Sequence, residues 1–268
     1  MLTINSSNNN YIEYNINENI AQINLNRPEK LNALNYPLLL EIVAILEKLH
    51  KNKDVRVLII QGKNGNFSSG DDLINLGPDG VRFKPLADGS KLPHHKVMRL
   101  IRELPKPVIA KIEGYCLGAG FELALACDFR LAADNIRIGD HRVKRAQCVM
   151  SGASWFLPRL IGFARATEII LTGKQLGAKE ALEIGLVNKV YPVAEFEERS
   201  KEFALELSKL PTKCLGYNKS MLNYSQYNEL FPSLINEFKF YCKNIATFDF
   251  GEGMKSFQEK RQPLFKGK

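Results

Sequence analysis

The sequence predicts an α/β core followed by a helical C-terminal extension, and three observations support this fold class. Short apolar runs typical of buried strands alternate with helical patterns up to about residue 192. Beyond residue 193 the pattern is helical alone. No internal repeat or low-complexity linker divides the 268 residues. We therefore assign residues 1–192 to one α/β core and residues 193–268 to a helical region.

The composition argues against several classes of protein. Hydrophobic residues make up 45% of the chain, which is enough for a sizeable core. No segment approaches the roughly 20 apolar residues that a transmembrane helix needs. The polar, Asn-rich start at residues 1–10 lacks the apolar core of a signal peptide. We interpret this start as a frayed arm, and we expect a cytoplasmic protein with no membrane contact.

The cysteines and histidines indicate neither disulfides nor a metal site. No Cys-x-x-Cys pair occurs, and an odd number of cysteines favours buried thiols in a reducing compartment. No pair of histidines has the spacing of metal ligands. These residues are Cys116, Cys127, Cys148, Cys214, Cys242, His50, His94, His95 and His141.

The net charge is +8, which suits a polyanion, either a nucleic acid or a phosphate-bearing cofactor. The basic residues are dispersed, apart from the run at residues 142–145, and no aromatic residues are interleaved with them. This distribution disfavours nucleic acid as a partner.

The first elements of the core follow from periodicity. The alternation at residues 20–25 predicts a half-exposed strand. Asn35 is suited to cap a helix at residues 36–51, whose leucines and isoleucines share one face. The continuous apolar run at residues 55–60 predicts a buried strand. Residues 77–92, rich in Gly, Pro and charge, predict a long loop.

The later elements are assigned in the same way. A short helix at residues 97–104 stops before Pro105, because a proline disfavours helical geometry in the residue before it. Residues 108–112 predict a strand, and residues 119–126 predict an apolar helix interrupted only by Glu122. Further strands are expected at residues 129–132, 136–138 and 187–190, and further helices at residues 153–160, 164–171, 178–183, 195–209 and 234–248.

Two glycine-containing turns, at residues 67–73 and 114–122, carry the chemistry. Each follows a predicted strand and leads into a predicted helix. A helix start exposes N–H groups that have no partner inside the helix, and small residues let a ligand approach them closely. Glu122 lies one helical turn after Ala119, on the same face. The combination predicts stabilisation of an enolate together with transfer of a proton.

Other motifs are missing. The turn at Gly114 lacks the spacing of a dinucleotide-binding fold, and Gly173-Lys174 is followed by Gln175, which breaks the P-loop pattern. No Gly-x-Ser-x-Gly nucleophile elbow is present. The sequence therefore gives no support to nucleotide binding of these types or to the usual serine hydrolase arrangement.

Together the motifs closely resemble those of the enoyl-CoA hydratase/isomerase (crotonase) superfamily. They occur in family order and span roughly residues 12–192. The segments that carry the resemblance are residues 26–34, 67–73, 114–128, 157–162, 171–173 and 181–188.

The resemblance implies a crotonase-like spiral of ββα turns and an acyl-CoA thioester substrate. Coenzyme A is then part of the substrate, with no separate prosthetic group. It also implies that the C-terminal helices build homotrimers, often paired as hexamers. It places the oxyanion hole at the main-chain N–H groups of Asp71 and Ala119, each able to supply about 3 kcal/mol. We interpret Asp72, which is common in the family, as a helix cap.

By the same resemblance, Glu122 matches one of the two catalytic glutamates of the hydratases. Its alternative role is to complement the positive end of a helix. The coenzyme A contacts are expected at the main chain near Ser69, Gly70 and Gly118 and near Lys30. An exposed Lys30 without a ligand is the alternative.

The chain departs from the family pattern at the second glutamate. Arg142 occupies the aligned position, and no acidic residue occurs from His141 to Thr167. Three substitutes remain open. Asp140 can move proton transfer two residues back, His141 can titrate near neutrality, or Arg142 can hold an oxygen-rich group on the acyl chain. The fourth alternative is a surface loop of solvated charges.

The sequence therefore predicts an acyl-CoA enzyme that stabilises a thioester enolate, with hydration or double-bond isomerisation as the favoured reaction. Thioester hydrolysis and decarboxylation are alternatives, because they also pass through an oxyanion. A protein that has kept the fold and binds RNA without catalysis is the alternative from a different class.

Overall fold

The computed structural model describes residues 11–73 and 92–268. The predicted N-terminal arm at residues 1–10 lies outside the described residues, and so does nearly all of the loop predicted at residues 77–92.

The main sheet has six strands in the order β1-β2-β3-β4-β6-β9. β1 and β2 pair antiparallel, and the other pairs are parallel. The strand predicted at residues 20–25 as half-exposed is instead almost wholly buried, because helices cover both faces of the sheet. The strands are β1 Ile12–Asn17, β2 Ile20–Leu25, β3 Val57–Gly62, β4 Val108–Ile112, β6 Phe129–Ala133 and β9 Lys189–Tyr191.

A second, smaller sheet carries the second glycine turn. It consists of β5 (Tyr115–Leu117), β7 (Arg137–Gly139) and β8 (Gln175–Leu176), in the order β5-β7-β8. β5 and β8 were not predicted, because β5 lies inside the second glycine turn and β8 has only two residues. β7 ends directly before Asp140, so this sheet brings residues 140–142 next to the second turn.

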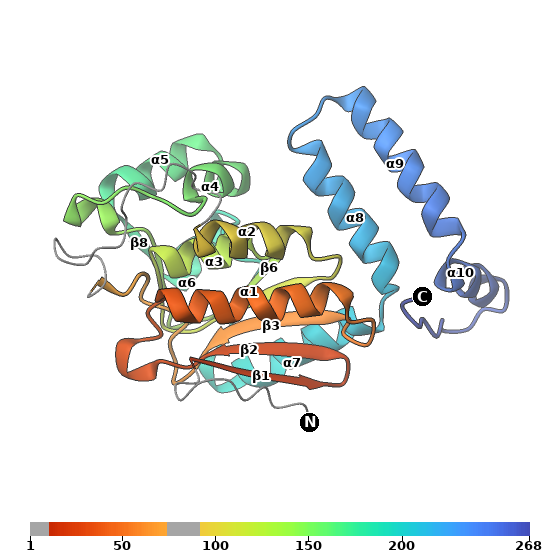
Figure 1. Cartoon of the computed structure of the whole chain (residues 1–268), viewed down its shortest axis with the longest axis horizontal. Coiled ribbons are helices and arrows are strands. Elements are labelled where there is room, and N and C mark those ends of the chain that lie inside the picture. The colour runs from red at the N-terminus through yellow and green to blue at the C-terminus, as the bar shows by residue number, and fades with distance from the viewer. Residues whose placement is uncertain (1–10, 74–91) are drawn as a thin grey trace.

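Helices cover both faces of the main sheet (Figure 1). The helices α1 (Tyr36–Lys51), α2 (Pro93–Glu103) and α3 (Ala119–Ala126) lie on one face, and α7 (Val193–Lys209) packs on the other. The predicted cap of α1 is confirmed, since the side chain of Asn35 accepts a hydrogen bond from Leu38 N at 3.0 Å.

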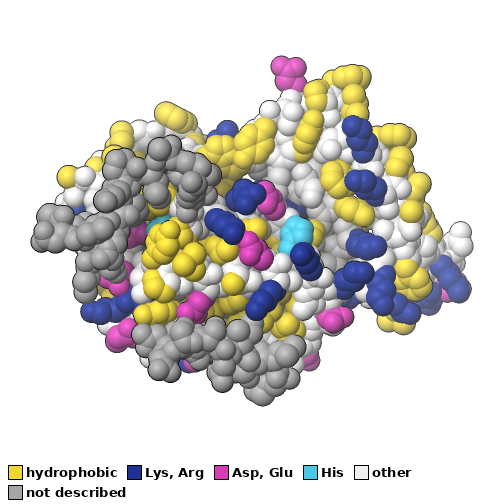
Figure 2. Space-filling view, in the orientation of Figure 1, with side chains coloured by type: hydrophobic (Ala, Val, Ile, Leu, Met, Phe, Trp, Pro, Cys, Tyr) yellow, Lys and Arg dark blue, Asp and Glu magenta, His cyan; other side chains and the backbone are white. Residues whose placement is uncertain are grey.

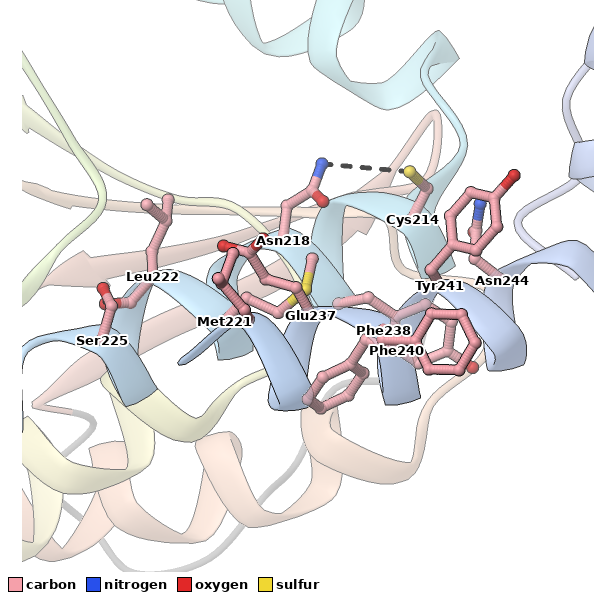
Figure 3. Close-up of a pocket in the computed structure, with 12 residues that line it drawn as sticks. Cys214, Asn218, Met221, Leu222, Ser225, Glu237, Phe238, Phe240, Tyr241 and Asn244 are labelled. Carbon is pink, nitrogen blue, oxygen red and sulfur yellow. Dashed lines mark hydrogen bonds between the residues drawn. The ribbon is translucent and has the colours of Figure 1, made fainter. Parts of the chain in front are cut away.

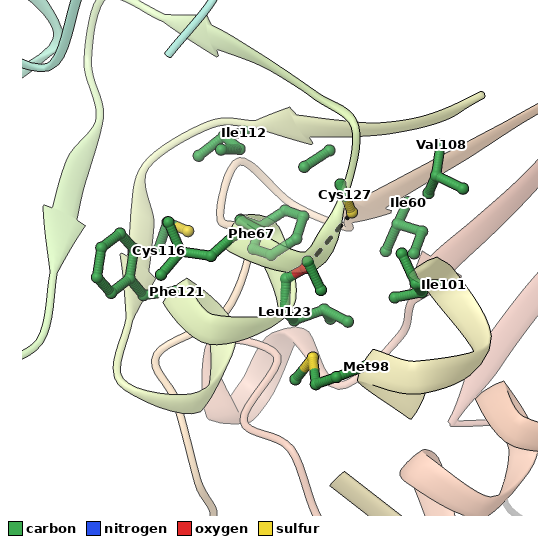
Figure 4. Packing of buried hydrophobic residues seen from close by; sticks show 14 of the residues in the cluster. Ile60, Phe67, Met98, Ile101, Val108, Ile112, Cys116, Phe121, Leu123 and Cys127 are labelled. Atoms are coloured by element: carbon green, nitrogen blue, oxygen red, sulfur yellow. Dashed lines mark hydrogen bonds between the residues drawn. The ribbon is translucent and has the colours of Figure 1, made fainter. Parts of the chain in front are cut away.

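The core holds α3 in place. Leu123 of α3 packs with Ile101 and Met98 of α2 and with Ile60 and Val108 of the sheet (Figure 4). Burying one such side chain contributes about 1.5–3 kcal/mol. All eight residues of α3 are buried, so the helix that carries Glu122 is fixed relative to the sheet.

The remaining helices agree with the prediction except near the C-terminus. The helix predicted at residues 234–248 is divided between two helices, because Thr247 caps a new one with its hydroxyl. An α8–α9 pair extends away from the core (Figure 1). The helices are α4 Ala153–Ile161, α5 Phe163–Thr172, α6 Ala178–Glu183, α8 Thr212–Ser225, α9 Leu230–Ile245 and α10 Phe248–Gln258.

The predicted fold class, an α/β core with C-terminal helices, is confirmed by these two mixed sheets and their helices. The prediction of buried thiols holds for Cys116 and Cys127 but is wrong for Cys148 and Cys242, which are exposed. Burial raises the pKa of Cys127 to about 12. Among the described residues, no helix combines the length and hydrophobicity needed to span a bilayer.

Candidate active site

The two glycine turns meet in the structure. Leu117 N donates to Ser68 O at 2.9 Å, which joins the turns in a short parallel bridge. A Cβ on Gly120 would lie 2.6 Å from the Cβ of Ser68, so only glycine fits at this crossing. A Cβ on Gly70 would lie 3.5 Å from Ala119 N, which places the first turn beside the start of α3.

Where the two turns meet, the main-chain N–H groups of Asp71 and Ala119 are not used in hydrogen bonds within the described residues. Leu34 N donates to Gly70 O and Asp72 N donates to Leu34 O, so both neighbours of Asp71 are tied to Leu34. Within residues 11–73 and 92–268, neither Asp71 N nor Ala119 N has an acceptor. These are the two N–H groups that the sequence predicts as an oxyanion hole.

Glycine at position 118 has a conformational reason. Its φ of 53° and ψ of −122° lie in a region that side chains disfavour, and Gly118 is the residue that turns the chain into α3. Gly118 N donates to Gly139 O at 3.1 Å, which anchors the turn to β7.

Glu122 is completely buried, and one of its oxygens is held by the start of α4. Oε1 accepts hydrogen bonds from the main-chain N–H groups of Met150, Ser151 and Ala153 at 3.2, 2.8 and 3.1 Å. Such N–H groups at a helix start suit a carboxylate. Oε2 lies 2.9 Å from Nη2 of Arg142, but the geometry does not make a hydrogen bond.

Arg142 is held by Asp140 rather than by Glu122. Nε of Arg142 donates to Oδ1 and Oδ2 of Asp140 at 3.0 and 3.1 Å, and Nη2 also donates to Oδ2. Both residues are buried, so the alternative of a solvated surface loop is wrong for them. Burial lowers the pKa of Arg142, but the hydrogen bond to Asp140 and the charges of Glu122, Asp140 and Asp71 outweigh it and raise the pKa.

A cavity of about 460 Å³ opens beside the two turns. It is lined by every residue predicted to contact coenzyme A, together with Asp71, His141 and Arg142. Glu122 is fully buried and does not line it, so Arg142 lies between the Glu122 carboxylate and the cavity. The predicted coenzyme A residues in the lining are Lys30, Ser69, Gly70 and Gly118.

His141 lies at the mouth of this cavity, half-buried, with Nε2 next to a guanidinium nitrogen of Arg145. Burial first, and then the charge of Arg145, lowers the pKa of His141 below its usual value. The imidazole is therefore largely neutral at pH 7, which does not favour it as an acid.

Sequence reasoning missed a hydrogen-bond partner of the Asp71 side chain in the first glycine turn. His94, in the first turn of α2, is buried, and its Nε2 lies 3.0 Å from Oδ1 of Asp71. Sequence reasoning considered only the main chain of Asp71. No local spacing links two residues that are 23 positions apart.

Asp72, predicted as a helix cap, forms an ion pair with Arg27 at 2.7 Å. The helix that it would cap falls outside the described residues, so the capping prediction is not tested.

Two further hollows contain none of the predicted site residues. One, of about 550 Å³, lies between α2, the start of α4 and the end of α8, next to the segment that holds Glu122. The other, of about 830 Å³, is a groove between α8 and α9 (Figure 3). Its volume is larger, but it is remote from the glycine turns, and the chemistry is therefore assigned to the cavity at the turns.

Comparisons with known proteins agree with this fold. The family model of enoyl-CoA hydratase/isomerase matches residues 15–268. A crotonyl-CoA hydratase of Syntrophomonas wolfei is 34% identical over 253 residues, which cover 92% of this chain and 95% of that one. A trans-2-decenoyl-[acyl-carrier-protein] isomerase of Streptococcus mutans is 31% identical over 265 residues, covering 96% and 98%. The crystal structure of an enoyl-CoA hydratase from Bacillus anthracis superposes with a TM-score of 0.90 at 34% identity, covering 96% of this chain and 100% of that one.

Proposed function

From the premise that the chain belongs to the enoyl-CoA hydratase/isomerase (crotonase) superfamily, we propose that it moves the double bond of an enoyl-CoA thioester, with Glu122 as the single base. The observation that carries the proposal is the environment of Glu122. Its carboxylate follows Ala119 by one helical turn, and its Oε2 has no hydrogen bond from any residue that the structure describes. The polar contacts of the carboxylate within the described residues are with three N–H groups and with the Arg142 guanidinium.

In the proposed reaction the thioester oxygen accepts hydrogen bonds from Asp71 N and Ala119 N. Glu122 Oε2 removes a proton from the carbon that flanks the double bond. The electron pair of the broken C–H bond moves into the conjugated system and charges the thioester oxygen. Each N–H donor stabilises this dienolate by about 3 kcal/mol. Glu122 then returns the proton at the other end of the system, so the product has the mass of the substrate.

Hydration requires two acid/base groups, because one group must activate water while another delivers a proton. By its resemblance to the family motif, Arg142 occupies the position expected for the second glutamate of the hydratases, and a guanidinium cannot exchange protons at ordinary pH. The Asp140 carboxylate accepts hydrogen bonds from Arg142, and Nε2 of His141 is in contact with a guanidinium nitrogen of Arg145. These observations favour a reaction that needs one base.

The surroundings of Arg142 also disfavour a substrate carboxylate. Asp140 and Glu122 are in contact with the guanidinium, and Asp71 Oδ2 lies 3.9 Å from Nη1. A fourth anion would be repelled by three carboxylates that already outnumber the cation. We therefore propose an uncharged acyl chain. During turnover Arg142 withdraws from Oε2 while keeping its bonds to Asp140, and the substrate carbon takes its place.

We propose that coenzyme A enters as part of the substrate along the cavity at the turns. The main chain of Ser69, Gly70 and Gly118 is close enough to the cavity to contact the pantetheine arm, and Lys30 and Arg145 supply positive charge for phosphates. No separate prosthetic group is needed for this reaction.

We also propose that the chain forms homotrimers, or hexamers built from them, through residues 193–268. Large apolar side chains are exposed on the C-terminal helices, and Figure 2 shows hydrophobic side chains along this part of the molecule. Sedimentation equilibrium should give three or six times 30.3 kDa, and a monomeric mass would overturn this proposal. The exposed side chains include Leu230, Phe231, Phe238, Tyr241 and Phe257.

Mass spectrometry of a panel of acyl-CoA thioesters tests the reaction. Isomerisation leaves the mass of a 3-enoyl-CoA unchanged and moves its double bond, which NMR detects. Gain of water would favour hydration. Release of free coenzyme A would favour thioester hydrolysis, and loss of CO2 would favour decarboxylation. A salt-sensitive RNA shift without affinity for any acyl-CoA would favour the RNA-binding alternative.

A further inference from the structure

We infer that His94 is a positioning residue for the oxyanion hole: it holds the Asp71 side chain so that Asp71 N stays directed at the substrate carbonyl. The inference rests on the proposed function, in which Asp71 N is one of the two donors to the thioester oxygen.

The contact between the two residues is a directed hydrogen bond. His94 is only 5% exposed, and its Nε2 lies 3.0 Å from Oδ1 of Asp71. An ionised carboxylate can only accept, so Nε2 carries the hydrogen and donates it. His94 belongs to α2, which Val97 and Ile101 anchor in the core, so the donor is held by a rigid element.

The Asp71 side chain is the part of this turn that the main chain leaves free. The residues on either side of Asp71 are tied to Leu34, and Asp71 N itself has no acceptor within the described parts of the chain. The side chain of Asp71 is 8% exposed, and its Oδ1 is in contact with His94. Arg142 Nη1 lies 3.9 Å from Oδ2, too far for a hydrogen bond. The peptide unit that carries Asp71 N also carries Gly70 O, which accepts a hydrogen bond from Leu34 N at 2.7 Å, and His94 adds a second restraint through the Asp71 side chain.

The unused nitrogen of His94 argues against a role in packing alone. Its Nδ1 is buried and has no hydrogen-bond partner among the residues that the structure describes. Leaving a polar atom in this state costs free energy, which an apolar side chain of similar size would avoid. The cost is explained if the Nε2 donor is needed at Asp71.

The next residue is anchored on a different partner. Asp72 pairs with Arg27 at 2.7 Å, and the Arg27 guanidinium also donates to Ala33 O at the same distance. The turn is thus held at two consecutive side chains, by Arg27 at Asp72 and by His94 at Asp71. Of these, only Asp71 presents its N–H to the cavity.

A chromophoric thioester measures the quality of the oxyanion hole without turnover. The absorbance of 4-(dimethylamino)cinnamoyl-CoA moves to longer wavelength when donors polarise its carbonyl. We expect a clear red shift with the unmodified protein and a loss of at least half of it in His94→Ala. His94→Gln, whose amide can donate to Asp71, should recover most of the shift. His50→Ala, at an exposed histidine of α1, is the matched control and should keep all of it.

Kinetics supply the second readout. His94→Ala should lower kcat about 10- to 100-fold, the scale of a misplaced catalytic group, and should change KM less than threefold. If His94 acts through Asp71, the double variant His94→Ala/Asp71→Ala should be no worse than Asp71→Ala alone. Should His94→Ala fail to fold, the comparison of His94→Gln with Asp71→Ala carries the same test.

The outcomes separate the two proposals. A red shift in the unmodified protein that His94→Ala retains in full would overturn the role of His94 and leave the oxyanion hole standing. Losses from His94→Ala and Asp71→Ala that simply add would overturn it as well. No red shift in the unmodified protein would overturn both proposals.

Discussion

Nη2 of Arg142 lies 2.9 Å from Oε2 of Glu122, and yet the two atoms do not form a hydrogen bond. Asp140 takes the well-directed donors of the guanidinium. The charge of Arg142 therefore faces the carboxylate, and the base role that we propose for Glu122 requires Arg142 to withdraw from Oε2.

The proton-transfer role of Glu122 is tested by Glu122→Gln, which keeps the shape of the side chain and removes its ability to exchange a proton. We expect turnover of an enoyl-CoA to fall about 100-fold or more. Affinity for a non-reactive acyl-CoA, measured by calorimetry, should change little. Near-full turnover in the variant would show that Glu122 is structural, with its carboxylate serving only to accept hydrogen bonds from the start of α4.

Substrate recognition is tested by thermal stability. A coenzyme A thioester should raise the melting temperature more than the free acyl acid does, because it binds only the folded protein and engages the cavity at the turns. Differential scanning fluorimetry at matched ligand concentrations makes the comparison. Equal shifts from both ligands would count against the assigned cavity.

The buried charges around Arg142 are tested by Arg142→Gln. The substitution leaves Asp140 and Glu122 without their cation, and breaking a buried pair in this way costs about 3–5 kcal/mol. Urea unfolding should show this loss. Lys174→Gln, which removes the exposed pairs to Glu168 and Glu180, is the control and should have no measurable effect. Equal stabilities of the two variants would contradict the buried cluster.

The effect of Arg142→Glu can be predicted from the same cluster of buried charges. It introduces a glutamate, but it gathers four carboxylates in one buried site. We therefore expect instability rather than a gain in hydratase activity, unless Asp140 is neutralised at the same time.

The contact between the two turns is tested at Gly120. A Cβ there would lie 2.6 Å from the Cβ and 3.0 Å from the main-chain oxygen of Ser68, so the turns must move apart. Gly120→Ala should lower turnover about 100-fold and stability by about 1–3 kcal/mol. Gly251→Ala, in an open position of α10, should instead be neutral or slightly stabilising.

The pH dependence of stability is tested at His141. Its pKa is lowered in the folded protein, so the unfolded chain binds the proton more readily as the pH falls through about 6.5. His141 therefore makes the folded protein less stable on acidification. Between pH 7.5 and 5.5, the melting temperature of His141→Gln should fall less than that of the unmodified protein. Equal decreases would show that His141 is not desolvated.

The parts of the site that lie within continuous segments could be predicted from the sequence. Asp71, Ala119 and Glu122 belong to two local patterns, and α3 was predicted with its observed bounds because its apolar run begins and ends sharply. The hydrogen bonds from the start of α4 to Glu122 could not be predicted, because they come from main-chain N–H groups, which do not depend on side-chain type.

Other features depended on tertiary contacts. The run at residues 142–145 has the composition of a solvated surface, and only the positions of Asp140 and Glu122 explain why Arg142 is buried. His94 was noted only as a residue without metal-ligand spacing, and its link to Asp71 exists only in the folded chain. Strand β5 lies inside the second glycine turn and β8 has only two residues, and their pairing with β7 forms them.

The most direct test of single-base proton transfer compares two substrates with one preparation of the protein. The account predicts that trans-3-hexenoyl-CoA is converted to its conjugated isomer without a change in mass, at a kcat well above that for hydration of crotonyl-CoA. Hydration of crotonyl-CoA with a kcat above about 1000 per second, the upper end of the usual range for enzymes, would contradict it, because a second acid/base group would then have to act beside Glu122.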